Sequence, residues 1–311
     1  MDMSDARVTR HDARSRGKTR GRVFLRIARV LLIAYLGLVG CAVIFEDKFI
    51  YYPSRYPDGY YQLVDSDSPN LPKIEDVWLT TADGTRIHGW YCQPRERTQD
   101  AGDAHAVVLY FHGNAGNLSH RIDVIDIFNA CGADVFIIDY HGYGRSEGKP
   151  SEAGLYEDAD AAWAYLTEQR GIAPSRIIIF GKSLGAAPGI KLAKENDPAG
   201  LIIESAFTSV PDMASQVMPI VPRFAIQTKM NSIDRIADVK CPKLFTHSPV
   251  DEIIPYSHGR ALYDAATEPK TFYDVNGAGH NNMQDVGGEA YRQAVRKFIE
   301  KCMKSPEQSN E

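Results

Sequence analysis

The segment 177–187 contains a serine placed where it could act as a nucleophile. A run of β-branched and aromatic residues ends in Gly-Lys-Ser-Leu-Gly, which predicts a strand, a sharp turn at Ser183 and a helix. Such a turn leaves no room for side chains two residues before and after the serine, and Gly181 and Gly185 meet that requirement. The amide of Leu184, at the start of the helix, would point toward a developing negative charge. The same pattern also occurs in ordinary loops, so the interpretation depends on partner residues elsewhere in the chain.

His280 is the candidate for the base that such a serine needs. It ends the glycine-containing segment 276–280, which follows the last predicted strand, 270–275, and can bring an imidazole over Ser183. When a turn of this kind carries the nucleophile, the acid and the base follow it in the order Ser, Asp, His. We therefore expect His280, rather than a histidine on an earlier element, to be the base.

The acid is expected between the serine and the histidine. Asp251 lies shortly after the predicted strand 243–247, with one helix and one strand between it and His280. Two alternatives remain open. Asp251 could serve only as the cap of a following helix, and Glu204, at the end of strand 200–204, could be the acid because some hydrolases place it there. We expect Asp251.

A second amide for an oxyanion is predicted in the loop 112–117. The loop follows the apolar strand 106–111, and its two glycines allow the backbone to approach a ligand closely. We assign the donor to the amide of Asn114. Asn117 could at the same time cap the next helix, and His112, although tempting as a base, lies where backbone is needed.

The elements that must position these residues alternate along the chain. A hairpin with an Asp-Gly turn is followed by short apolar strands that alternate with amphipathic helices, which predicts a mostly parallel sheet covered on both faces. In such a sheet, ligands bind at the carboxyl ends of the strands. The fold class is therefore α/β. The predicted strands are 74–81, 85–92, 106–111, 133–139, 176–180, 200–204, 243–247 and 270–275, and the predicted helices are 117–129, 152–169, 184–194, 257–267 and 288–303.

Four motifs together resemble the membrane-anchored α/β-hydrolase-domain family, which includes bacterial hydrolases and eukaryotic palmitoyl-protein thioesterases. They are FHGNAGN at 111–117, DYHGYGRS at 139–146, GKSLG at 181–185 and VDEIIP at 250–255. The resemblance implies an α/β-hydrolase fold, a triad of Ser183, Asp251 and His280, and an N-terminal anchor that runs into Tyr-Tyr-Pro. The chain departs from the family pattern at three places and loses no catalytic group by it. These are Ser248 in place of a glycine, His141 in place of an arginine, and a softened small-residue run after the nucleophile that contains Pro188.

The N-terminal region predicts attachment to a membrane. Residues 1–22 are polar and basic and are expected to be disordered. Segment 23–45 is apolar, with Arg26 and Arg29 able to reach headgroups, and as a helix it would extend roughly 34 Å, enough to cross a bilayer. The basic flank predicts a cytoplasmic N-terminus and an exported catalytic domain. An alternative is a lipoprotein anchored at Cys41, in the sequence Leu-Val-Gly-Cys.

These observations divide the 311 residues into five parts. We predict a basic cytoplasmic tail at 1–22, a transmembrane signal anchor at 23–45, a membrane-proximal linker at 46–73, a catalytic domain at 74–303 and a disordered tail at 304–311. A net charge of −5 gives no indication of nucleic-acid binding, and the five scattered cysteines indicate neither a zinc site nor a disulfide framework.

The sequence predicts a serine hydrolase that cleaves carboxylic ester or thioester bonds and requires no cofactor or metal. The segment 206–239, between two predicted strands, is too short for a full lid domain and carries flexible apolar side chains, which suits an acyl chain. The expected partners are the bilayer and an acyl-bearing small molecule, lipid or lipidated protein. A serine peptidase of the same fold and an inactive membrane-tethered binding protein are the alternatives.

Overall fold

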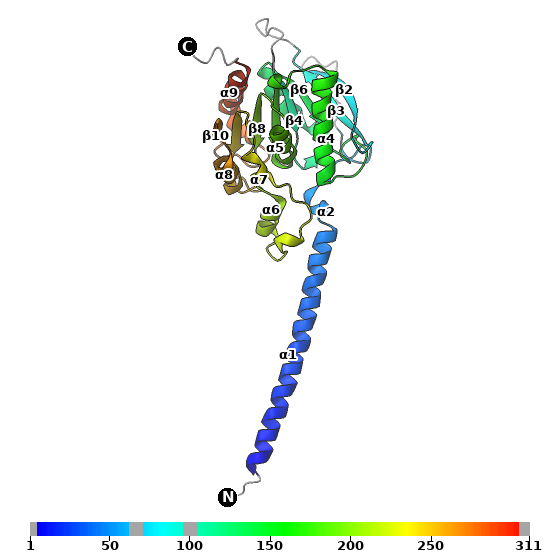
Figure 1. The fold of residues 1–311 in the computed structure, drawn as a ribbon, viewed down its shortest axis with the longest axis vertical. Helices are drawn as coiled ribbons and strands as arrows, with labels where there is room; N and C mark the ends of the chain where they lie inside the picture. The colour runs from blue at the N-terminus through cyan, green and yellow to red at the C-terminus, as the bar shows by residue number, and fades with distance from the viewer. Residues whose placement is uncertain (1–4, 62–70, 96–104, 305–311) are drawn as a thin grey trace.

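A computed structural model describes the chain except for residues 1–4, 62–70, 96–104 and 305–311. Its centre is an eight-stranded sheet (Figure 1). The strands are β2 (Lys73–Thr80), β3 (Arg86–Gln93), β4 (Val107–Phe111), β6 (Asp134–Ile138), β7 (Ile177–Lys182), β8 (Gly200–Glu204), β9 (Lys243–His247) and β10 (Lys270–Asp274). They lie in the order β10-β9-β8-β7-β4-β6-β3-β2. The pairs from β10 to β6 are parallel, and only the pairs β6–β3 and β3–β2 are antiparallel. The predicted α/β class and mostly parallel sheet are confirmed.

The sheet has one hydrophobic core on each face because successive strand residues point to opposite sides. In β7, Ile177 and Ile179 belong to one core and Ile178 and Phe180 to the other, and all four are fully buried. A strand buried on both faces reads as a continuous apolar run, which is why β7 was recognisable in the sequence.

Helices cover both faces of the sheet. One core includes buried side chains from α4 (Glu152–Ala164), α5 (Ala186–Glu195), α7 (Ser232–Ile236) and α8 (Tyr256–Ala265). The other includes side chains from α3 (Ile122–Ala130) and α9 (Met283–Met303). The parallel strands between these layers therefore all end at one edge, where the loops that follow them meet.

Several element boundaries differ from the prediction. Helix α3 is preceded by the 3-10 turn Leu118–Arg121, and the Asn117 side chain caps this turn by accepting a hydrogen bond from the Ser119 amide, as expected. Helix α9 starts at Met283 rather than at 288, because the backbone is helical on both sides of a kink at Gly288 with φ of 50°. The segment 206–239, to which the sequence analysis assigns no element, contains α6 (Val210–Val217), capped by Ser209, and α7.

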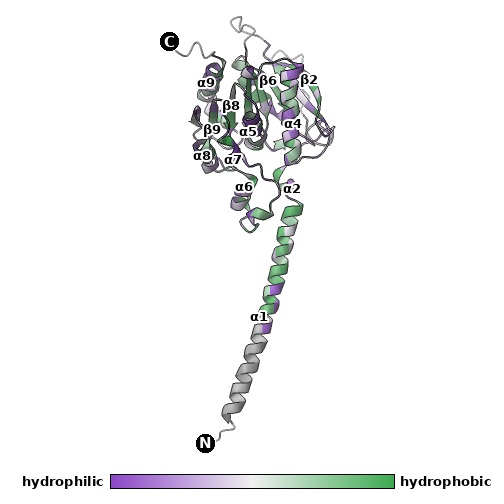
Figure 2. Ribbon diagram, viewed as in Figure 1, coloured by the Kyte–Doolittle hydropathy of each residue, from purple (hydrophilic) through white to green (hydrophobic). Residues whose placement is uncertain are grey.

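The chain begins with one long helix, α1 (Asp5–Ile44), followed by the short helix α2 (Asp47–Ile50). Within α1, Phe24–Ile44 is long and apolar enough to cross a bilayer, and a signal sequence can have the same length and composition. Figure 2 shows this apolar part of α1 next to the domain. The disorder expected for residues 1–22 is corrected for residues 5–22, since the helix extends back to Asp5, and residues 1–4 lie outside the described residues. Proline is absent there, and Ala, Arg and Lys are good helix formers.

The first part of the segment expected to be a linker is ordered against the domain. Strand β1 (Tyr52–Pro53) pairs in parallel with β5 (Ala115–Gly116), which lies in the loop after β4. Tyr51 is 5% exposed and belongs to a core. Residues 62–70 of the same segment lie outside the described residues, as does most of the tail 304–311. The end of α1 is thus connected to the loop after β4 by only a few residues.

Candidate active site

Ser183 lies at a sharp turn between β7 and α5. The 3-10 turn Ser183–Gly185 follows the strand directly, and Ser183 adopts a φ of 53°, in the left-handed region that side chains rarely occupy. A Cβ added at Gly181 would lie 2.6 Å from Ala186 Cα, and one added at Gly185 would overlap the Phe111 carbonyl. The predicted strand, turn and helix are therefore present, and both glycines are required by close backbone contacts.

Asp251 and His280 are joined at the same edge of the sheet. His280 Nδ1 lies 2.8 Å from Asp251 Oδ2, and the Asp251 carboxylate is fully buried. The other oxygen, Oδ1, accepts hydrogen bonds from the amides of Ile253 at 2.9 Å and Ile254 at 2.8 Å. The loop after β9 thus holds the carboxylate in place, and the carboxylate orients the imidazole so that Nε2 is free for another partner.

A second histidine supports the same carboxylate. His247, the last residue of β9, is 1% exposed, and its Nε2 lies 2.9 Å from the Ile254 carbonyl and 3.4 Å from Asp251 Oδ2. Burial alone would raise the pKa of Asp251, but hydrogen bonds from His247 and His280 hold this pKa well below its usual range. Asp251 is therefore ionised at neutral pH. The sequence reasoning missed His247, whose position on the strand before the acid was the available signal.

Ser183, Leu184 and Asn114 line one cavity of about 290 Å³. A Cβ added at Gly113 would lie only 3.7 Å from Ser183 Cβ, so the loop after β4 passes directly beside the serine. Leu184 is in the first turn of a helix, where amides have no partner within the helix. Within the described residues, the Ser183 hydroxyl makes no hydrogen bond to His280. The predicted residues therefore form two groups at one edge of the sheet. Ser183, Leu184 and Asn114 line the cavity, and Asp251 and His280 form a hydrogen-bonded pair.

Residues of α2 and β1 hold the Asn114 loop. The amide of Tyr52 donates to the Asn114 carbonyl at 3.1 Å, and the Asn114 side chain donates to the Ile50 carbonyl at 3.1 Å. Tyr143 adds a hydrogen bond of 2.8 Å from its hydroxyl to the same Asn114 carbonyl. With its carbonyl and side chain fixed in this way, the Asn114 peptide unit cannot rotate freely.

His112 is part of the core rather than of the cavity. It is 0% exposed, and its ring packs against Tyr140 at 4.5 Å between ring centroids. Its Nδ1 lies 2.7 Å from the Gly113 carbonyl and its Nε2 lies 3.5 Å from Asp139. Burial lowers the pKa of His112. Its contacts fix the start of the Asn114 loop.

Comparison with known proteins identifies the family. Residues 102–233 match the family model described as serine aminopeptidase, S33. The chain is 36% identical over 274 residues to an uncharacterized protein of Mycobacterium tuberculosis, covering 86% of this chain and 94% of that protein. It is 34% identical over 294 residues to the α/β-hydrolase domain-containing protein WAV2 of Arabidopsis thaliana, covering 88% and 92%. The chain belongs to the α/β-hydrolase-domain family.

A solved structure agrees with this assignment at the level of the fold. The Pyrococcus furiosus esterase Pf2001 superposes with a TM-score of 0.65 and 18% identity, covering 81% of this hydrolase and all of the esterase. The α/β-hydrolase domain-containing protein 17B of Xenopus tropicalis is 34% identical over 229 residues, covering 73% of this hydrolase and 75% of that protein. The resemblance to the α/β-hydrolase-domain family, drawn from the four motifs, is thus confirmed.

Glu204, the alternative acid, is occupied by other contacts in the hydrolase. It is fully buried and forms an ion pair of 3.0 Å with Lys182, the residue before Ser183. It also accepts hydrogen bonds from the Tyr291 hydroxyl at 2.6 Å and the Gln284 amide at 2.9 Å. These contacts join β7 and β8 to α9, the helix that follows the His280 loop. Glu204 therefore holds together the elements that precede Ser183 and follow His280, whereas Asp251 contacts the imidazole of His280.

Ser248, which stands where the family usually has glycine, connects the two loops of the Asp251–His280 pair. Its hydroxyl donates to the Ala278 carbonyl at 2.5 Å and accepts from the Val250 amide at 3.2 Å. Pro188 lies in the first turn of α5, where its missing amide hydrogen is tolerated, as predicted. The third departure, His141, binds the buried Asp158 through Nδ1 at 2.6 Å.

Among the described residues, one group has the composition of a metal site. Ligand atoms of Asp83, His141 and Glu157 lie within 4.8 Å of one another. The group lies on the β2–β3 turn, the loop after β6 and α4, and not on the loops that carry Ser183 and His280. His141 Nδ1 is taken by Asp158, so Nε2, which lies 3.4 Å from Asp83, is the nitrogen that faces the group. We assign no role to it.

The Lys182–Glu204 pair makes a testable contribution to stability. Glu204→Gln should lower the free energy of unfolding by about 3 kcal/mol or more, because it leaves the Lys182 ammonium buried without a counter-charge. Chemical denaturation of the purified protein in detergent measures the effect. Adding Lys182→Met should recover much of the loss. Equal losses in the single and double variants would mean that the charge pair is not the cause.

Proposed function

We propose that this hydrolase cleaves carboxylic ester or thioester bonds through an acyl-enzyme formed on Ser183. The observation that carries the proposal is that a serine in the left-handed conformation and a buried Asp251–His280 pair both follow parallel strands and so lie at the same edge of the sheet. A serine raised on such a turn and an imidazole oriented by a buried carboxylate are the parts that acyl transfer requires.

The first half of the proposed reaction forms the acyl-enzyme. Ser183 Oγ attacks the acyl carbonyl carbon while its proton moves to His280 Nε2. The carbonyl oxygen becomes an oxyanion, which accepts hydrogen bonds from the amides of Leu184 and Asn114. The bond to the leaving group then breaks, and the alcohol or thiol leaves with the proton from Nε2. Hydrogen bonds of this kind are often long before substrate binds, which fits the absence of a Ser183–His280 bond among the described residues.

The second half releases the acid. Water gives a proton to His280 Nε2 and attacks the ester of Ser183, and the same two amides hold the second oxyanion. The proton returns to Ser183 Oγ as the carboxylic acid leaves. Asp251 remains ionised throughout, keeps the Nδ1 tautomer and stabilises the imidazolium. No step of this sequence uses a cofactor.

The cavity at Ser183 supports an acyl group as the substrate. Apart from Ser183, Asn114 and Tyr52, its lining is apolar, with side chains from α2, α6 and the loop after Asp251. The match to the serine aminopeptidase model favours a peptidase as the second candidate. A peptidase that grips a free amino terminus needs carboxylates at its site, and among the described residues that line this cavity none is acidic. We therefore place esters and thioesters first.

The apolar part of α1 supports a membrane location for this reaction. With Phe24–Ile44 in a bilayer, the domain would lie close to the membrane surface, where acyl chains of lipids or lipidated proteins are the available substrates. We propose that the helix is kept as an anchor and that the catalytic domain is extracytoplasmic. An anchor at Cys41 remains the alternative.

Loss of the serine hydroxyl tests the proposed function directly. Ser183→Ala should abolish labelling by a fluorophosphonate and lower ester hydrolysis on the order of 10⁴-fold, because nucleophile and base act as a unit. Ser205→Ala is a matched control, since Ser205 is also buried, with a φ of 47°, at the end of the next strand. A panel of esters, thioesters and aminoacyl amides then ranks the bond types. Normal hydrolysis by Ser183→Ala would reject the proposal, and no labelling of the wild type would favour an inactive binding protein.

The acid is tested by a comparison of two carboxylates. Asp251→Asn should lower kcat by roughly 10³–10⁴-fold, because the amide favours the wrong imidazole tautomer. Glu204→Gln, measured at a temperature where it is folded, should lower kcat far less, because Glu204 contacts Lys182 and not His280. Steady-state kinetics on one ester decide between them. The reversed order would move the acid to β8.

The orientation follows from the charges that flank the apolar segment. Arg22, Arg26 and Arg29 precede it or lie in its first turns, whereas Glu46, Asp47 and Lys48 nearly balance after it. Because positive flanks resist translocation, alkaline phosphatase fused after Met303 should be active. Green fluorescent protein at the same position, exported by the Sec route, should be dark. The opposite pattern would place the catalytic domain in the cytoplasm.

A further inference from the structure

We infer that the end of α1 and the helix after it form one wall of a binding site for a long acyl chain, which continues from the cavity at Ser183. The inference rests on the proposed acyl transfer and adds to it where the chain of the acyl group lies. It makes the juxtamembrane segment part of the substrate site rather than a tether.

Two cavities share one set of walls. The cavity that contains Ser183 and a second cavity of about 230 Å³ are both lined by side chains of α2, the residue Tyr52, and α6. The shared residues are Phe49, Ile50, Tyr52, Val210, Met213 and Val217. The two cavities therefore lie next to each other along these side chains. In the inferred site, an acyl group bound at the serine continues along them into the second cavity.

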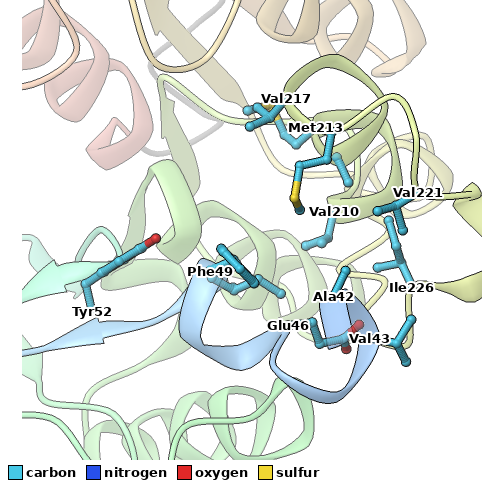
Figure 3. A pocket seen from close by; sticks show the side chains of 13 residues that line it. Ala42, Val43, Glu46, Phe49, Tyr52, Val210, Met213, Val217, Val221 and Ile226 are labelled. Atoms are coloured by element: carbon cyan, nitrogen blue, oxygen red, sulfur yellow. The ribbon is translucent and has the colours of Figure 1, made fainter. Parts of the chain in front are cut away.

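The second cavity extends to the end of α1. Ala42 and Val43, from the last turn of α1, line one side, and Ala214 and Ile226, from the segment 206–239, line the other. Figure 3 shows α1 and α2 facing that segment across the cavity. Apart from Glu46, the lining consists of Ala, Val, Ile and Met side chains and the rings of Phe49 and Tyr52. This composition fits a single unbranched hydrocarbon chain and offers little to a polar group.

Glu46 is the one charged side chain in the lining, and its carboxylate is engaged in hydrogen bonds with the segment 206–239. Its carboxylate accepts hydrogen bonds from the amides of Gln227 at 2.9 Å and Thr228 at 2.8 Å, and from the Thr228 hydroxyl at 2.8 Å. These bonds tie the end of α1 to the opposite wall. The cavity is therefore held together by a specific contact between the juxtamembrane residues and the catalytic domain, not by chance proximity.

Exposed apolar residues lie at the same end of the domain. Phe224 is 87% exposed, Val217 70% and Ile220 55%, in the segment that lies next to the exit of α1 (Figure 1). Large exposed side chains of this kind commonly mark a membrane or partner contact. Together with the apolar helix beside them, they indicate that the mouth of the second cavity faces the bilayer. The occupant we propose is an acyl chain that comes from the bilayer.

The length of the acyl chain should therefore control the reaction. For p-nitrophenyl esters and the wild-type full chain, kcat/KM should rise about fourfold per methylene from butanoate onward, until the second cavity is full. Ala214→Phe narrows only the second cavity, so it should leave butanoate hydrolysis within about twofold and lower dodecanoate hydrolysis by about tenfold or more. Ala42→Phe, on the opposite wall, should do the same.

A matched control lies on the same helix. Leu36→Phe changes an exposed residue of α1 that lines neither cavity, and it should leave the chain-length profile unchanged. If the wild type hydrolyses butanoate but shows a flat profile, or if both cavity variants keep the wild-type profile, the inference fails while the proposed function stands. If the wild type hydrolyses neither esters nor thioesters, the proposed function itself fails.

Crosslinking gives a second measurement that needs no variant. An alkyl fluorophosphonate with a diazirine at the chain end reacts with Ser183 and, on irradiation, should attach to peptides within 42–50 or 210–226. Attachment only elsewhere in the catalytic domain would overturn the inference. The source of the chain is tested in lipid nanodiscs with a dodecanoyl lysophospholipid and a dodecanoyl thioester of a short peptide. The inference requires that the wild type hydrolyses at least one of these two substrates and that Ala214→Phe hydrolyses the same substrate more slowly. Equal rates for the wild type and Ala214→Phe would contradict the inference.

Discussion

The close contact between the turn after β7 and the end of β4 is the constraint on which the candidate site depends. Gly185 lies so near the backbone of Phe111 and His112 that no side chain fits, and this contact brings the loop after β4 next to Ser183. A larger residue there would separate two strands that are neighbours in the sheet. This approach places the loop after β4 beside the serine, and hydrogen bonds from Tyr52 and Tyr143 then hold Asn114 within that loop.

Much of the fold and of the site could be predicted because their signals are local. Buried parallel strands such as β7 are continuous apolar runs, and the turn at Ser183 needs glycines at fixed positions. Asp251 and His280 were found from their places after strands, and their mutual hydrogen bond agrees with that reading. Their roles in catalysis stay a prediction until activity is measured.

The parts that were missed depend on contacts distant in sequence. Strands β1 and β5 have two residues each, too few for any periodicity, and they exist because the backbone after α2 meets the loop after β4. Ser248 looked like a departure from a family pattern, yet it joins the two loops of the site. Lys182 was read only as the residue before the nucleophile, and its buried partner is on another strand. No property of these residues alone indicates such partners.

The short connection between α1 and the loop after β4 has a geometric consequence. Between Ile44 and Tyr52 the chain forms α2 and then pairs with the domain. The catalytic domain is therefore joined to α1 by a short, ordered connection and not by a flexible linker. With Phe24–Ile44 in a bilayer, the height of Ser183 above the headgroups would be nearly constant. The enzyme would then select substrates by the distance between the scissile bond and the membrane surface as well as by the chemistry of that bond.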